Sequence, residues 1–135
     1  NAMGNYAQQY VITYLKEKLP NWNFDRKKIP HISQNDRTDL SFDIVAASPK
    51  GNYCAIEVSF QVTTNSTIER KGGQAQSRQN LVHAAGHKVA YVIDGAGNFK
   101  RVSALRSICQ FSDCTVSFKD SELDLLIEFL KSLDN

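Results

Sequence analysis

The sequence predicts an α/β protein with one central mixed β-sheet flanked by helices. Apolar and polar residues alternate over 40–47 and again over 53–62, which is typical of half-buried strands. An apolar run within 87–94 indicates a third, buried strand. A segment of helical length lies between the second and third of these runs, so we expect those two strands to pair in parallel through a helical crossover.

The first part of the chain is predicted to form a helix over 5–18 and a strand over 21–29. Pro20 ends the helix because proline lacks the backbone N–H that a helix interior requires. The strand assignment is the weaker of the two, since its residues are mostly polar. The inward-facing stripe expected on the helix consists of Tyr6, Tyr10, Val11, Tyr14 and Leu15.

The two alternating segments, 40–47 and 53–62, are predicted to form a β-hairpin. The linker 48–52 contains the Pro and Gly typical of a hairpin loop. One face of each strand is apolar, and the other carries acidic or polar residues. If the last residue before the loop faces the first residue after it, the expected pairs are Ala47–Tyr53, Ile44–Ile56, Asp43–Glu57 and Phe42–Val58.

The second half of the chain alternates between predicted helices and strands. Asn65, Ser66 and Thr67 are good N-caps for a helix over about 67–84, and Gly86 is placed to end it. The residues 94–98 predict a turn after the third strand. The last elements expected are a helix over 102–109, a strand over 114–118 and an acidic helix over 121–132.

Two carboxylates are expected to meet on the polar face of the hairpin. In the predicted register, Asp43 lies directly opposite Glu57, and side chains so opposed are about 5 Å apart at Cβ. Two carboxylates this close repel each other unless a cation or a shared proton lies between them. Oxygen ligands on strands suit Mg²⁺ or Mn²⁺, so the hairpin predicts a divalent-cation site.

The element order and the two carboxylates resemble the PD-(D/E)XK nuclease superfamily, the fold of type II restriction endonucleases and Holliday-junction resolvases. The resemblance covers about residues 4–95, which would form the αβββαβ core, followed by a C-terminal αβα extension. Members place an Asp on the second core strand and Glu-X-Lys on the third, and Asp43 and Glu57 match these positions. The stretch 57–71 is also similar to restriction enzymes in its general character.

The sequence departs from the family pattern at the lysine. Ser59 stands where the catalytic lysine is expected, and Phe42 replaces the proline of the motif. Two residues are able to replace the lysine. Gln61 lies on the same strand face and would orient water, whereas Lys71 lies in the first turns of the next helix and would supply the positive charge.

The resemblance implies a metal-dependent DNA endonuclease, most simply of restriction type. Asp43 and Glu57 would bind Mg²⁺ or Mn²⁺ with the backbone carbonyl of Val58, while Lys71 would stabilise charge on the phosphate. Gln8 stands where many relatives carry a Glu that contacts the metal through water, so we expect it to have a supporting role. The residues expected to contact DNA, most simply double-stranded, are Arg70, Arg78, Lys100 and Arg101.

Composition fits this class of protein. The net charge of +2 combines −4 over residues 120–135 with +6 over the rest, which allows a polyanionic partner without requiring one. No apolar run is long enough for a membrane span, and three cysteines without metal-type spacing favour a reduced, cytoplasmic protein. Asn1 and Ala2 before Met3 are typical of an expression-tag scar, which leaves one domain over 3–135.

Other functions remain open at this point. The replacement of lysine by Ser59 also fits a nucleic-acid-binding module that keeps the nuclease fold but has lost turnover. A resolvase-like enzyme that works as a homodimer would have this chain length. The third alternative is an unrelated α/β protein whose hairpin carboxylates are only surface residues. His83 and His87 have a spacing that can bind Zn²⁺, but Gly86 interrupts the helix between them, which argues against a zinc site.

Overall fold

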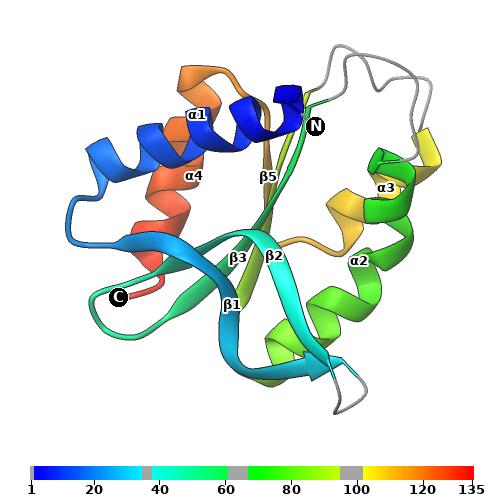
Figure 1. The fold of residues 1–135 in the computed structure, drawn as a ribbon, viewed down its shortest axis with the longest axis horizontal. Coiled ribbons are helices and arrows are strands. Elements are labelled where there is room, and N and C mark those ends of the chain that lie inside the picture. Colours follow the sequence, from blue (N-terminus) through cyan, green and yellow to red (C-terminus); the bar gives the residue numbers. More distant parts are fainter. Residues whose placement is uncertain (1, 35–37, 61–66, 95–101) are drawn as a thin grey trace.

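The computed structural model describes residues 2–34, 38–60, 67–94 and 102–135. Within these ranges the chain forms a mixed five-stranded sheet and four helices, in the expected order α-β-β-β-α-β followed by α-β-α (Figure 1). The elements are α1 (Ala2–Lys18), β1 (Asn23–Gln34), β2 (Thr38–Ala47), β3 (Tyr53–Ser59), α2 (Thr67–Ala84), β4 (Lys88–Ile93), α3 (Val102–Gln110), β5 (Cys114–Val116) and α4 (Asp120–Ser132).

The strands lie in the order β1-β2-β3-β4-β5. The pairs β1–β2 and β2–β3 are antiparallel, whereas β3–β4 and β4–β5 are parallel. The prediction that the third strand joins the hairpin in parallel is therefore confirmed, with α2 as the crossover helix. Two of the predicted hairpin pairs, Ala47–Tyr53 and Ile44–Ile56, are also confirmed.

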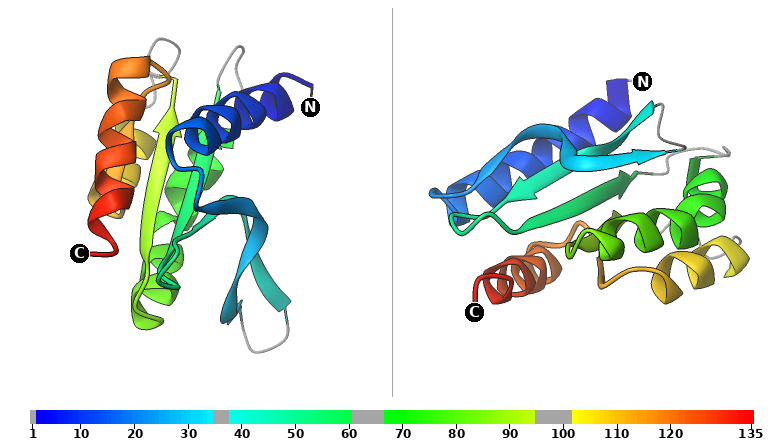
Figure 2. Two further views of the ribbon diagram at one scale, coloured as in Figure 1. Left: turned by 90° about the vertical axis from the view of Figure 1, so that its left-hand side faces the viewer. Right: turned by 90° about the horizontal axis from the view of Figure 1, so that it is seen from below.

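Two apolar layers cover the two faces of the sheet. Helices α1 and α4 pack on one face, and α2 packs with α3 on the other, as the right-hand view of Figure 2 shows for α1 and α2. On the first face, alternate sheet residues such as Ile44, Ile56 and Val92 are buried. On the second face the residues between them, such as Val45, Ala55 and Tyr91, are buried. The acidic residue Glu57 belongs to this second face by the same alternation.

Helix α1 faces the sheet with a different stripe from the one predicted. Ala7, Val11 and Leu15 are buried, whereas Tyr6 is 76% exposed and Tyr10 is 43% exposed. The prediction was wrong for these two tyrosines. The residues that face the sheet are spaced four apart and are small or aliphatic. Tyr10 and Tyr14 instead donate hydrogen bonds across to Asp120 and Asp124 of α4.

The strand β1 is longer than the predicted segment 21–29 and continues through Pro30 to Gln34. Proline is tolerated here because β1 is an edge strand, so one side of it needs no partner. The β1–β2 register shifts three times, and the two strands form a bent ribbon that leaves the plane of the sheet (Figure 2).

This bend changes the face on which part of β2 is buried. Phe42 packs in the layer with α2, whereas Ile44 and Val58 pack in the layer with α1. The predicted Phe42–Val58 pair is therefore wrong. The β2–β3 ladder ends at the pair Ile44–Ile56, so the predicted pair Asp43–Glu57 is also wrong as a ladder pair, and the strands separate next to Asp43.

The other boundaries lie close to their predictions. Within the described residues, β3 ends at Ser59 rather than at residue 62. Gly86 ends α2 with a φ of 85°, and the amides of Gly86 and His87 bond back to the carbonyls of His83 and Val82. The N-cap residues 65–66 and most of the predicted turn at 94–98 lie outside the described residues. No helix in the described part of the chain is long and apolar enough to cross a membrane.

Candidate active site

The carboxylates of Asp43 and Glu57 lie where β2 and β3 separate. Each carboxylate replaces a missing partner of the sheet ladder. The amide of Asp43 donates to Glu57 Oε2 at 2.9 Å, and the amide of Val58 donates to Asp43 Oδ2 at 2.9 Å. Where the strand pairing breaks, the unpaired backbone amides therefore bond to the same two carboxylates that the sequence singled out. These bonds hold both side chains in place.

Lys71 brings a positive charge to this pair from α2. Its Nζ lies 2.7 Å from Asp43 Oδ2 and 3.5 Å from Glu57 Oε1. The side chain is only 7% exposed, compared with 23% for Asp43 and 4% for Glu57. The ammonium thus points toward the two carboxylates and away from solvent, which is the direction expected of a lysine that replaces the one missing at Ser59.

A second cation contacts the same pair. The Nη1 of Arg78 donates to Glu57 Oε1 at 3.1 Å and to the carbonyl of Ser41 at 3.0 Å. The two carboxylates are therefore matched by two cations from one helix, Lys71 and Arg78. This pairing explains how two acidic side chains are tolerated in a site with so little exposure to water.

The environment changes the pKa values of the two acids in opposite directions. Burial alone would raise the pKa of Asp43, but the charge and hydrogen bond of Lys71 and the amide of Val58 outweigh it, and its pKa lies below the ordinary range. Burial raises the pKa of Glu57, and the nearby Asp43 adds to this rise, although Lys71 and Arg78 oppose it. Closely placed acids with separated pKa values are typical of functional sites.

The neighbouring residues of β3 have distinct environments. The Ser59 side chain is buried, and its Oγ is the one buried polar side-chain atom without a hydrogen-bond partner among the described residues. The amide of Val58 points toward Asp43, and because N–H and C=O of one strand residue point to the same side, its carbonyl faces β2 as well. Gln61 lies outside the described residues.

Lys27, which was not among the predicted site residues, also reaches this region. Its Nζ donates a short hydrogen bond to the backbone carbonyl of Asp43, and it lies 3.5 Å from Gln8 Oε1. Gln8 is therefore connected to Asp43 through Lys27, and no direct bond between Gln8 and either carboxylate is found in the described part of the chain. The signal in the sequence was the basic run 26–28 on the strand beside β2.

The residues expected to contact DNA divide into three groups. Arg70 is exposed on α2. Arg78 is bonded through Nη1 to Glu57 and to the carbonyl of Ser41, within the protein. Lys100 and Arg101 lie outside the described residues.

The donor atoms of the site fit a hard divalent cation. Two carboxylates and a strand carbonyl offer oxygen ligands, and Mg²⁺ is often held by one or two carboxylates together with water and substrate phosphate. No group of three or more His, Cys, Asp or Glu converges within the described ranges, so this part of the chain offers two acidic ligands at most to one ion. His83 and His87 have separate partners, Asp113 and the amide of Tyr53, which does not support a shared zinc.

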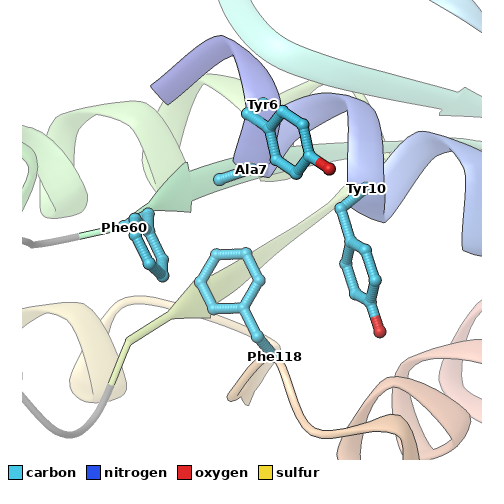
Figure 3. Close-up of a pocket in the computed structure, with 5 residues that line it drawn as sticks. All are labelled: Tyr6, Ala7, Tyr10, Phe60 and Phe118. Carbon is cyan, nitrogen blue, oxygen red and sulfur yellow. The ribbon is translucent and has the colours of Figure 1, made fainter. Parts of the chain in front are cut away.

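A separate aromatic cleft lies on the α1 and α4 face of the sheet (Figure 3). Its volume is about 300 Å³. The rings of Phe60 and Phe118 meet edge to face at 5.5 Å, and Figure 3 shows that both rings lie below α1. The residues that line the cleft are Tyr6, Ala7, Tyr10, Phe60 and Phe118. None of them is a carboxylate or a cation, unlike the residues of the Asp43–Glu57 site on the opposite face.

Comparisons with known proteins show similarity to restriction enzymes. The sequence is 48% identical over 139 residues to the type II restriction enzyme HgiCI of Herpetosiphon aurantiacus, in an alignment that covers 100% of this chain and 40% of that enzyme. It is 45% identical over 134 residues to the type II restriction enzyme BanI of Aneurinibacillus aneurinilyticus, covering 96% of this chain and 38% of that enzyme. This chain therefore spans about two-fifths of the length of these relatives. No solved structure matches it.

The family assignment follows from the extent of the match. The sequence profile described as the BanI C-terminal domain matches residues 1–134, nearly the whole chain. The relatives are restriction enzymes, in agreement with the class of nuclease that the hairpin carboxylates suggested. The chain belongs to the BanI C-terminal domain family of type II restriction enzymes.

Proposed function

We propose that this chain carries the active centre of a metal-dependent type II restriction endonuclease with a PD-(D/E)XK core. The αβββαβ order over α1 to β4 supports the fold. Asp43 and Glu57 on the two adjacent central strands support the position of the site. Similarity to two restriction enzymes supports the reaction class, phosphodiester hydrolysis in DNA.

The observation that carries the proposal is the position of Lys71. Ser59 occupies the lysine position of the family motif and cannot supply a charge. The Lys71 ammonium, 2.7 Å from Asp43, replaces that charge from the helix that follows β3. A buried, oriented cation beside two acids is the arrangement that stabilises charge on a phosphate in the transition state.

The residues of the site have different roles in the proposed reaction. Asp43, Glu57 and the Val58 carbonyl would hold Mg²⁺ or Mn²⁺, which would supply Lewis-acid activation of the scissile phosphodiester. Lys71 would stabilise the negative charge that develops on the phosphate. Gln61 and the hydroxyl of Ser59 are the uncharged groups proposed to orient water.

The proposed partner is double-stranded DNA. Arg70 is exposed on the same helix as Lys71 and is proposed to contact the phosphate backbone with Lys100 and Arg101. Because a duplex offers one scissile phosphate on each strand, the proposal includes two copies of the chain acting together. The homologous enzymes are more than twice as long, and the remaining part of such an enzyme would contribute to recognition of the target sequence.

A second function is supported by one specific observation. With Ser59 in place of the motif lysine, the chain would serve as a DNA-binding module of the same fold that binds without cleaving. The position of Lys71 favours the active enzyme over this alternative. Similarity to restriction enzymes likewise favours this class over a Holliday-junction resolvase.

The test begins with Mn²⁺ titrated calorimetrically into the protein and into its Asp43→Ala and Glu57→Ala variants. We expect the parent to bind and both variants to lose binding. Asp25→Ala is the control because Asp25 is an exposed carboxylate paired with Lys16 outside the site. Equal Mn²⁺ affinity in parent and both variants would refute the site. Cleavage of mixed plasmid DNA with Mg²⁺ or Mn²⁺ then separates the enzyme from the binding module.

A further inference from the structure

Arg78 contacts three neighbouring structural features of the site at once. Its Nη1 donates to Glu57 on β3 at 3.1 Å and to the carbonyl of Ser41 on β2 at 3.0 Å. Its guanidinium carbon also lies 5.2 Å from the ring centre of Phe42, the residue before Asp43. One side chain of α2 therefore connects the two strands that carry the two acids, at the place where those strands no longer pair with each other.

Arg78 and Lys71 lie on the same face of α2. They are seven residues apart, which is about two helical turns, and the buried Ala75 lies between them. Lys71 is closest to Asp43, at 2.7 Å, and Arg78 bonds only to Glu57 of the two acids. Lys71 also lies 3.5 Å from Glu57, so the helix presents one cation to both carboxylates and a second cation to Glu57 alone.

The two oxygens of Glu57 have different donors. The amide of Asp43 donates to Oε2, and Arg78 donates to Oε1. The Arg78 side chain is 17% exposed, and its Nη1 already makes two bonds inside the protein. A guanidinium held in this way is poorly placed to contact a phosphate of DNA, but it restricts the rotation of the Glu57 carboxylate.

We propose that Arg78 is a positioning residue that holds Glu57 in the orientation needed to bind the divalent cation, and that it is not a DNA contact. This inference rests on the proposed function of the site. It depends on the planar guanidinium, because both bonds come from Nη1, whose two N–H groups have directions fixed by the plane of the group. A lysine at this position would keep the charge, but its rotatable ammonium would not fix the directions of its N–H groups in the same way.

The experiment compares Arg78→Ala and Arg78→Lys with Arg70→Ala, an exposed arginine on the same helix. Mn²⁺ affinity is measured by calorimetry, and binding to a DNA duplex is measured over a range of salt concentrations. We expect Arg78→Ala to lose about 10-fold or more in Mn²⁺ affinity, as is typical when a group that orients a metal ligand is removed. Its salt dependence of DNA binding should equal that of the parent.

Arg70→Ala should behave in the opposite way. It should keep the Mn²⁺ affinity of the parent and reduce the salt slope of DNA binding by about one phosphate contact. If Arg78→Ala does not fold, as judged by circular dichroism, Arg78→Lys decides. Weaker Mn²⁺ binding by this lysine variant supports the positioning role of the rigid guanidinium, whereas parental affinity overturns it.

The outcomes separate the two proposals. If the parent binds no Mn²⁺, the proposed function fails, and this inference fails with it. If the parent binds Mn²⁺ and a folded Arg78→Ala variant binds it equally well, only the positioning role is overturned. A reduced salt slope in Arg78→Ala with unchanged Mn²⁺ affinity would identify Arg78 as a DNA contact instead.

Discussion

Replacing Lys71 by Met tests both the stability and the chemistry of the site. Methionine keeps much of the length of the side chain but removes its charge. In the structure the ammonium lies 2.7 Å from Asp43 and 3.5 Å from Glu57 and is 7% exposed, so water screens it weakly. Its removal leaves two acids with one remaining cation, Arg78.

The expected loss of stability follows from this geometry. Removing one partner of a buried ion pair costs about 3–5 kcal/mol. The remaining Arg78 and the partial exposure of Asp43 place the estimate at the lower end, about 3 kcal/mol in the free energy of unfolding. For a chain of this size such a loss lowers Tm by roughly 10 °C.

The expected loss of activity is larger. Removing a single preorganised charge-stabilising group lowers kcat by about 10²–10³-fold. Both effects are measurable, by urea denaturation and by the rate of plasmid cleavage with Mg²⁺. Lys88→Met is the matched control, because Lys88 is exposed at the start of β4, at the opposite end of that strand from the site. If Lys71→Met unfolds at the same midpoint as the parent and cleaves at the same rate, the reasoning about this lysine is wrong.

Two further predictions concern the scaffold. Gly72→Ala should lose about 1–3 kcal/mol of stability in urea denaturation, because a Cβ there would lie 2.9 Å from the Cα of Ala104; Gly73→Ala, which has open space, should be neutral or stabilising, and equal losses would contradict the close contact of α2 and α3. The hydrogen bond to Asp124 raises the pKa of Tyr14 to about 12, so its contribution to stability is present below pH 10 and is lost as the pH rises toward 12. Tyr14→Phe should therefore weaken the pH dependence of unfolding in that window, and an unchanged dependence would contradict the bond.

Local patterns in the sequence were enough to predict most of the architecture. Alternation over 40–47 and 53–62 predicted the two strands, and pairing the residues on either side of the loop predicted the register at Ala47–Tyr53. The segment between residues 62 and 87 is long enough for a crossover helix, which predicted the parallel pairing of β3 with β4. The same patterns identified Asp43 and Glu57, because an acidic residue within an alternating strand segment can be recognised from the sequence alone.

Other features were decided by contacts between distant residues. The bend of the β1–β2 ribbon moves Phe42 to the α2 layer, and no local pattern marks it. The aromatic rings of α1 also misled the prediction, because Tyr6 and Tyr10 are exposed while Ala7 is buried.

The charges of the site show most clearly the difference between what the sequence determines and what the tertiary structure determines. The sequence shows a missing lysine at Ser59 and offers Lys71 as a replacement, and helix geometry alone makes that choice reasonable. Only the tertiary structure shows that α2 passes over the gap between β2 and β3, so that Lys71 meets both carboxylates and Arg78, two turns away, meets Glu57. The sequence by itself determined which groups carry the charges, whereas the packing of α2 on the sheet decided which charges meet, because that distance depends on every residue between the helix and the strands.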